Sequence, residues 1–274
     1  MRHKGLSLIE ILVVIAIIAI LLAIAVPALQ KCKKQGKDLV CANNLRQLGL
    51  AVSIYAQEKT AYPEGFCGDD TCHPPISGQK SLESGISNTK DWMGYWWFCF
   101  LADTIGDDFA DKKGVLWCPS KKLSDAGLSR NILCGNYGIN YSICKIIMAS
   151  PDEFSGRPFR PERVGHPSAK LILMDSGYAL ASWKALAPDT GIYPFENPSR
   201  QNSYFLPGVT INEQRFEDGT INQFQQDDAI GGRHSLGKIN AVFADGHVDR
   251  IKPSSVEPTF DAVGNILSSP SWSP

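Results

Sequence analysis

The stretch KGLSLIEILVVIAIIAILLAIAVPAL, residues 4–29, decides the class of this protein. No polar residue stands between Ile11 and Val26, and about 20 apolar residues are enough for one helix to cross a bilayer. No second run of this kind follows. The sequence therefore predicts a single membrane-spanning helix, with a soluble domain of roughly 220–240 residues behind it.

Glu10 is the only charged residue between Leu6 and Leu29. An ionised side chain at mid-membrane costs roughly 2.5–3.5 kcal/mol on insertion scales, and less near the end of a helix. A carboxylate in such a place predicts a function and a partner group. The alternative is that the Glu10 side chain only reaches the membrane surface.

A secretory signal peptide is a second interpretation of the run. Arg2, His3 and Lys4 form a basic start, and Ala23 and Ala25 provide a small-x-small cleavage site. The run is longer than the 7–15 apolar residues typical of signal peptides, which favours a retained helix.

Two signals disagree on orientation. Five basic residues follow the run closely, and by themselves they place the C-terminal side in the cytoplasm: Lys31, Lys33, Lys34, Lys37 and Arg46. Eight cysteines favour an oxidising compartment instead. We give the cysteines precedence and expect the domain after the helix to lie outside the cytoplasm.

The segment Gly5-Leu6-Ser7-Leu8-Ile9-Glu10, followed by an unbroken apolar helix, resembles the N-terminus of a type IV prepilin or pseudopilin. The resemblance implies that residues 1–5 are a leader, cut after Gly5 by a prepilin peptidase that also methylates the new N-terminus at Leu6. The family usually has Phe after the cut, so Leu6 is a mild departure. Glu10 takes the place of the family's glutamate, and Pro27 that of a helix-bending proline. The resemblance also implies a bacterial inner membrane, a cytoplasmic leader and an external head.

Cleavage would create an α-amine at Leu6, normally a cation near neutral pH. An amine and a carboxylate in low dielectric satisfy each other far better than either does alone. If Glu10 of one subunit meets the Leu6 amine of its neighbour, the pair favours stacking of helices and fixes their register. Expected partners are therefore the membrane, the prepilin peptidase, other pilin-like subunits and the assembly platform.

The helix is expected to continue through residues 30–58. One face carries a spacing of four, three, four and three residues, formed by Cys41, Leu45, Leu48, Val52 and Tyr55. Pro27 is expected to bend the helix and Gly36 to weaken it. We expect an α+β fold in which residues 6–29 span the membrane. Residues 30–58 pack on an antiparallel sheet, within a loop-rich head formed by residues 59–274.

The middle of the chain offers two ambiguous motifs. Cys67, Cys72 and His73 lie close enough for a metal knuckle, but a small disulfide loop fits the spacing better. The aromatic-rich stretch 91–103 predicts buried core, with a glycan or partner platform as the alternative. Strands are expected within 136–144 and 169–177, and residues 186–230 read as a long surface excursion.

Residues 231–251, GGRHSLGKINAVFADGHVDRI, predict a β-hairpin that turns at Asp245-Gly246. They also resemble a C-terminal signature of prepilin-like proteins: a His, a nine-residue spacer and Asp-Gly. Here ten residues separate His234 from Asp245, so the equivalence of His234 is uncertain. His234, Asp245, His247 and Asp249 are weak metal candidates. Hydrogen-bonded turn residues are the favoured interpretation, with no metal or cofactor expected.

The sequence as a whole favours a structural subunit of a type II secretion or type IV pilus-like filament. The alternative is a membrane-anchored surface protein that binds a glycan or protein without assembling. A net charge of −1 argues against nucleic-acid binding. We find no nucleophile elbow, phosphate loop or other catalytic signature, so we do not expect an enzyme.

Overall fold

The structure is a computed structural model. It describes residues 8–68, 94–106, 114–147, 154–186, 205–217, 221, 223–234, 237–260 and 266–274. Gly5 and Leu6, at the expected cleavage site, lie outside the described residues, as do Cys72, His73 and Trp92.

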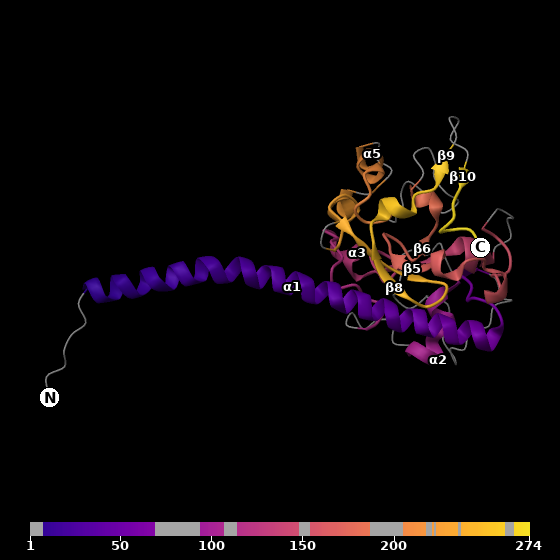
Figure 1. Cartoon of the computed structure of the whole chain (residues 1–274), viewed down its shortest axis with the longest axis horizontal. Coiled ribbons are helices and arrows are strands. Elements are labelled where there is room, and N and C mark those ends of the chain that lie inside the picture. Colours follow the sequence, from indigo (N-terminus) through magenta and orange to yellow (C-terminus); the bar gives the residue numbers. More distant parts are fainter. Residues whose placement is uncertain are drawn as a thin grey trace.

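One helix dominates the shape of the molecule (Figure 1). Helix α1 runs from Leu8 to Lys59 without interruption, which at 1.5 Å per residue gives a length of about 80 Å. Pro27 lies inside α1, and the ribbon arches gently along its free half before it reaches the head (Figure 1). Neither Pro27 nor Gly36 breaks the helix. The expected helix is confirmed to within two residues at its described ends.

The head is organised on a five-stranded sheet in the order β6-β3-β5-β7-β8. All neighbouring strands are antiparallel except β3 and β6, which are parallel, so the sheet departs from the expected pattern at one edge. Helix α1 packs on β5, β7 and β8. The architecture is the expected α+β, pilin-like one, a long N-terminal helix laid on a sheet. The strands are β3 (Tyr137–Asn140), β5 (Leu171–Asp175), β6 (Leu180–Ala181), β7 (Ile239–Phe243) and β8 (Val248–Ile251).

The head also contains a small second sheet, a pair of short strands and several short helices. A small sheet has the order β2-β1-β4, and β9 pairs with β10. These strands are β1 (Phe66–Cys67), β2 (Tyr95–Trp96), β4 (Ile146–Ile147), β9 (Thr259–Phe260) and β10 (Ile266–Ser268). The short helices are η1 (Trp97–Leu101), α2 (Ala102–Ile105), α3 (Ala126–Arg130), α4 (Tyr141–Cys144), η2 (Pro161–Arg163), η3 (Pro167–Ala169), η4 (Trp183–Leu186), α5 (Ile211–Glu217), η5 (Gln223–Gln225), α6 (Gln226–Ala229) and η7 (Pro253–Val256).

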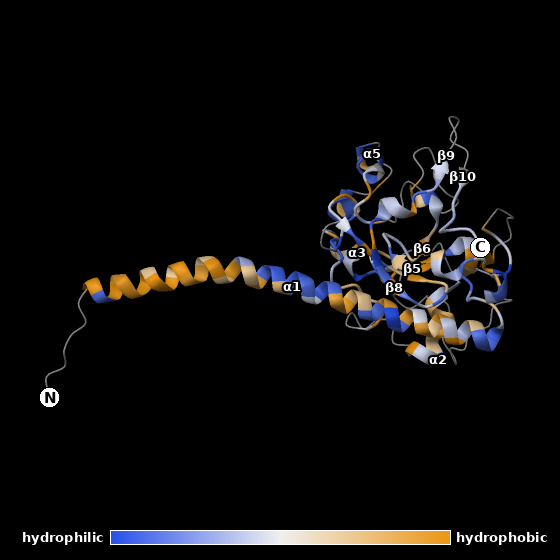
Figure 2. Cartoon of the chain, viewed as in Figure 1, coloured by the Kyte–Doolittle hydropathy of each residue, from blue (hydrophilic) through white to orange (hydrophobic). Residues whose placement is uncertain are grey.

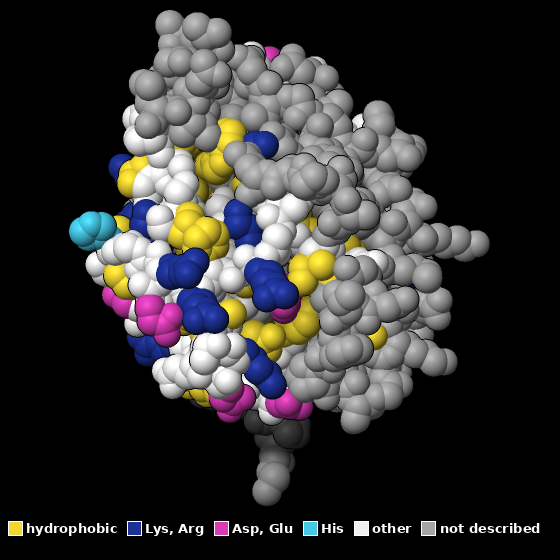
Figure 3. All heavy atoms as spheres, turned by 90° about the vertical axis from the view of Figure 1, so that its right-hand side faces the viewer, with side chains coloured by type: hydrophobic (Ala, Val, Ile, Leu, Met, Phe, Trp, Pro, Cys, Tyr) yellow, Lys and Arg dark blue, Asp and Glu magenta, His cyan; other side chains and the backbone are white. Residues whose placement is uncertain are grey.

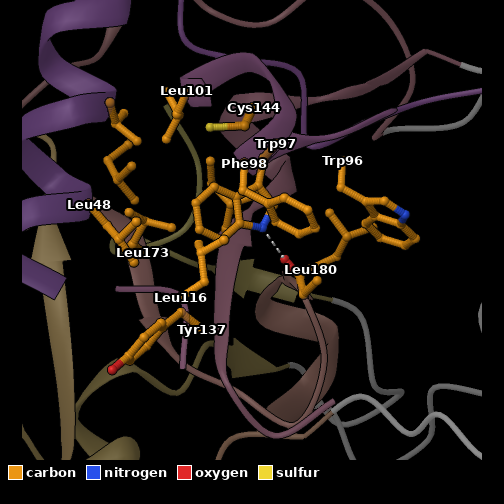
Figure 4. Packing of buried hydrophobic residues seen from close by; sticks show 14 of the residues in the cluster. Leu48, Trp96, Trp97, Phe98, Leu101, Leu116, Tyr137, Cys144, Leu173 and Leu180 are labelled. Carbon is orange, nitrogen blue, oxygen red and sulfur yellow. Dashed lines mark hydrogen bonds between the residues drawn. The ribbon is translucent and has the colours of Figure 1, made fainter. Parts of the chain in front are cut away.

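The aromatic-rich stretch forms part of the core, as expected for its described residues. Trp96, Trp97, Phe98 and Phe100 are all buried (Figure 4 shows the first three). The indole Nε1 of Trp97 donates a hydrogen bond to the Ala179 carbonyl oxygen at 2.9 Å, which satisfies its one polar atom. These rings are therefore unavailable as a binding platform.

One expected strand is shorter than its alternation suggested. β3 ends at Asn140, whose side-chain oxygen accepts a hydrogen bond from the Ser142 backbone N–H at 3.0 Å. Asn140 thereby caps the N-terminus of α4, and Tyr141 and Ile143 lie in a helical turn instead of a strand. The side-chain hydrogen bond of the cap outweighs the β propensity of the aromatic and branched residues.

The expected C-terminal hairpin is confirmed. β7 and β8 pair antiparallel, with Val242 opposite Val248. The Gly246 N–H donates to the Phe243 carbonyl oxygen at 2.9 Å, and Gly246 has φ of +88°. This positive φ explains why the turn needs glycine at its last position.

Candidate functional site

The first half of α1 is largely apolar and is not covered by the head. Every residue from Leu8 to Lys37 is exposed, and Figure 2 shows the apolar colouring of this half as it projects from the head. Large apolar residues this exposed are unusual in water and indicate a surface that something else covers. Among the described residues, α1 is the one helix long and apolar enough to cross a membrane.

Glu10 and Pro27 both lie on this free half. Glu10 is in the first turn of α1, where the positive end of the helix dipole stabilises a carboxylate. Pro27 lies just before the chain becomes polar, at the basic band formed by Lys31, Lys33, Lys34 and Lys37 (Figure 2).

The second half of α1 is buried by the head along the expected face. Cys41, Leu45, Leu48 and Val52 are buried, while Tyr55 is partly buried. Helix and sheet approach closely at Gly49, where an added Cβ would lie 2.6 Å from Cγ1 of Val242. Asp38, one turn before Cys41, is only 1% exposed, which is unusual for a carboxylate.

That carboxylate meets His234. The Nδ1 atom of His234 lies 2.8 Å from Oδ1 of Asp38, and its Nε2 atom lies 2.9 Å from Oδ2 of Asp175 at the end of β5. Burial alone would lower the pKa of His234, but the charge of Asp175 and hydrogen bonding to Asp175 and Cys118 together outweigh it and raise the pKa to about 10. Without a bound metal ion, His234 is therefore a buried imidazolium that lies between two carboxylates.

Two thiols complete this cluster, which we call the His234 cluster: Asp38, Cys41, Cys118, Asp175 and His234. The sulfur atoms of Cys41 and Cys118 lie 2.8 Å apart, and His234 offers a ring nitrogen within 4.8 Å of both. Burial raises the pKa of the Cys118 thiol well above its ordinary value. Cys118 belongs to the Trp117–Ser120 turn, so the cluster joins four segments that are distant in the sequence.

The residue before His234 anchors this loop. Arg233 is buried, and its guanidinium forms hydrogen bonds with both oxygens of Asp228, at 2.8 Å from Nε to each. It also donates to the backbone carbonyls of Asn136, at 2.6 Å, and Ser176. A bidentate pair with further acceptors satisfies a buried charge and holds His234 in place.

Asp245 and His247 lie elsewhere. The Nδ1 atom of His247 is 2.5 Å from Oδ1 of Asp245, and both side chains are exposed. The His247 ring stacks on Phe243 at 4.3 Å, while Asp249 accepts a hydrogen bond from the Arg250 backbone N–H. The structure therefore separates His234 from the other candidates of the C-terminal motif. They act as hydrogen-bonded hairpin residues, as favoured from sequence.

Sequence reasoning missed four residues that surround His234: Asp38, Asp175, Asp228 and Arg233. The available signal was Asp38, which lies three residues before Cys41 on the apolar helix face. The others join the site only through tertiary structure.

The cysteines outside the His234 cluster and the far end of the head identify no further site. Cys67 is disulfide-bonded, with its partner outside the described residues, and Cys32, Cys41, Cys99, Cys118 and Cys144 are free thiols. Figure 3 shows the end of the head away from the free helix. Its described part mixes Lys and Arg with apolar and acidic side chains. That mixture identifies no ligand class.

Comparisons with known proteins agree with the N-terminal interpretation. Residues 1–26 match the family model described as the prokaryotic N-terminal methylation motif. The chain is also 38% identical over 63 residues to the type IV major pilin protein PilA of Myxococcus xanthus (strain DK1622). This match covers 23% of the chain and only 29% of that pilin, and no solved structure matches the chain. The chain thus carries a prepilin-type N-terminus, and its similarity to a pilin is partial.

Proposed function

We propose that this chain is a structural subunit of a type II secretion or type IV pilus-like filament. We divide the chain into a leader (1–5), a helix that lies in the membrane or the filament core (6–29), a continuation of this helix (30–58) and a head (59–274). The observation that carries the proposal is the exposed apolar half of α1, which bears Glu10 and is rigidly continuous with the half that the head buries. The prepilin-type motif at residues 1–26 supports the same conclusion.

A helix of this kind can occupy two environments in turn. Before assembly the apolar half lies in the bilayer, with the leader in the cytoplasm and the head outside the inner membrane. In a filament the same surface packs on neighbouring helices and remains out of water. Because α1 has no break between the two halves, the same helix joins this surface to the head in both environments.

Glu10 and the processed N-terminus give the assembly its register. Cleavage between Gly5 and Leu6 by the prepilin peptidase would expose an α-amine, and Glu10 of one subunit would pair with that amine of its neighbour. A buried carboxylate and ammonium each cost far more alone than together, so misaligned packing is penalised. The pair therefore selects the correct register of the helices and contributes less to the net free energy of assembly. The role is structural, and the proposed partners are other subunits and the assembly platform.

The test compares two glutamates on one helix in the native host. Glu10→Ala should remain in the membrane fraction but be absent from filaments sheared from cells, while Glu58→Ala, an exposed glutamate at the far end of α1, should assemble like wild type. Assembly of Glu10→Ala like wild type would contradict the role of Glu10 in register, and absence of the wild-type chain from sheared filaments would favour a membrane-anchored binding protein. Peptide mapping of the same material would test the small disulfide loop that we propose between Cys67 and Cys72.

A further inference from the structure

The His234 cluster holds an uncommon set of side chains for a core. Cys41, Cys118 and His234 are buried, and each offers a ligand atom within 4.8 Å of the others. Asp175, also fully buried, lies 2.9 Å from the His234 ring through its Oδ2 atom. Two thiols, an imidazole and a carboxylate are the donor types that bind zinc in proteins.

One buried oxygen of the cluster, Oδ1 of Asp175, has no hydrogen bond. The Nε2 atom of His234 forms an ion pair with the other oxygen, Oδ2, at 2.9 Å. Oδ2 of Asp175 already accepts from the Asn240 backbone N–H at 2.7 Å. Buried polar atoms nearly always have partners, so the unpaired Oδ1 atom of Asp175 beside the His234 ring indicates a missing ligand.

The Asp38 carboxylate orients the His234 ring, as a carboxylate often does for a histidine that binds a metal ion. Its Oδ1 atom lies 2.8 Å from Nδ1, which fixes a proton on that nitrogen and leaves Nε2 facing Asp175, 2.9 Å from Oδ2. Histidines that bind metals commonly donate their other ring N–H to a carboxylate, which orients the ring and raises its basicity. Arg250, with its Nη1 atom 4.0 Å from Oδ2 of Asp38, offsets part of the negative charge.

We propose that the His234 cluster is a structural zinc site, with Cys41 Sγ, Cys118 Sγ, His234 Nε2 and Asp175 Oδ1 as ligands. Binding replaces the thiol protons and the proton on Nε2, so up to three protons leave for each ion bound. Zn–S bonds of about 2.3 Å in a tetrahedron put the two sulfurs about 3.8 Å apart, so the thiols separate by about 1 Å on binding. The ion would tie α1 to the Trp117–Ser120 turn, the end of β5 and the loop before β7.

A disulfide between Cys41 and Cys118 is the competing chemistry. The sulfurs are 2.8 Å apart, which is longer than the 2.03–2.05 Å of a disulfide bond. A disulfide would also leave Oδ1 of Asp175 without a partner. Zinc would use the three ligand atoms that lie within 4.8 Å of one another and would take Asp175 as its fourth ligand.

The test uses the full chain, purified in detergent from membranes without chelators and analysed for metal content. We expect about one zinc per chain, lost in Cys41→Ser, Cys118→Ser and His234→Gln but kept in Cys99→Ser, a buried thiol outside the cluster. Cobalt substituted into the wild-type chain should show thiolate-to-metal charge transfer and the strong visible absorption of a tetrahedral site. This measurement needs no variant and therefore stands even if the variants do not fold.

Two results would overturn the proposal. One is a reduced wild-type chain that takes up neither zinc nor cobalt. The other is a chain from the host whose Cys41 and Cys118 resist alkylation until reduced and appear as one linked peptide pair in mass spectrometry. Neither result bears on filament assembly, which Glu10→Ala tests separately.

Discussion

The two halves of α1 share one backbone conformation and differ in everything that covers them. From Leu8 to Lys37 every residue is exposed, whereas the half that follows buries Asp38, Cys41, Leu45 and Leu48 against the head. The buried half turns one apolar face to the head, although Leu39, Val40 and Leu50 stay exposed, while the free half is apolar all round from Ile11 to Leu29. A helix apolar on every side belongs in lipid or among other helices, and an amphipathic one on a sheet. The second half of α1 therefore stabilises the fold of the head, and the first half is available to lipid or to other helices.

The largest contrast should come from truncating a leucine in each half. Leu48→Ala removes a fully buried side chain and should lower the free energy of unfolding of the head by about 2–5 kcal/mol. Leu21→Ala, at a site that is 62% exposed, should leave head unfolding unchanged. Urea unfolding of the detergent-solubilised chain, followed by tryptophan fluorescence, measures both. Equal losses would mean that the free half also stabilises the head.

Two glycines of α1 should respond to the same substitution with opposite signs. Gly49→Ala places a Cβ 2.6 Å from Cγ1 of Val242 and should destabilise by about 1–3 kcal/mol. Gly36→Ala meets nothing within 4 Å and should stabilise the helix by up to about 1 kcal/mol. Thermal unfolding by circular dichroism distinguishes the two. A stabilising Gly49→Ala would show that α1 and β7 are not in close contact.

A smaller, pH-dependent effect should appear at Glu64, which follows the buried half. Burial raises the pKa of Glu64, although its hydrogen bond with Tyr55 acts the other way. Because the folded state then holds its proton more tightly than the unfolded chain, the stabilising contribution is present at low pH. It is lost as pH rises through the raised pKa. The wild type should therefore lose stability relative to Glu64→Gln as pH rises above the ordinary range of glutamate. A pH series of urea midpoints tests this, with Glu58→Gln as the exposed control.

The smallest effect is expected at the hairpin turn. The hydrogen bond from His247 lowers the pKa of Asp245 despite the opposing effect of burial, but the pair is exposed to solvent. Exposed ion pairs contribute little, so His247→Ala should unfold within about 0.5 kcal/mol of wild type at neutral pH. A loss as large as that of Leu48→Ala would give this pair a structural role that its exposure does not support.

The sequence predicted the features that depend on local pattern. Helix α1, strand β5 and the hairpin at Asp245-Gly246 follow from apolar periodicity and turn chemistry, which act over a few residues. The predicted end of β3 was wrong because Asn140 caps α4, although the alternation of residues through Ile143 is typical of a strand. The His234 cluster was out of reach, because His234 and Asp38 are 196 positions apart and only the fold brings them together. The sequence placed His234 with Asp245 and His247 because proximity along the chain was the only distance available.

The N-terminus of the chain in its native membrane tests the central claim most directly. Intact mass and N-terminal sequencing of the membrane fraction should give a chain that begins at a methylated Leu6, which would make Glu10 the fifth residue of a processed subunit. A chain that still begins at Met1 would contradict the filament account. A start near Val26 would show that the apolar run is a signal peptide, and that the free half of α1 is absent from the mature protein.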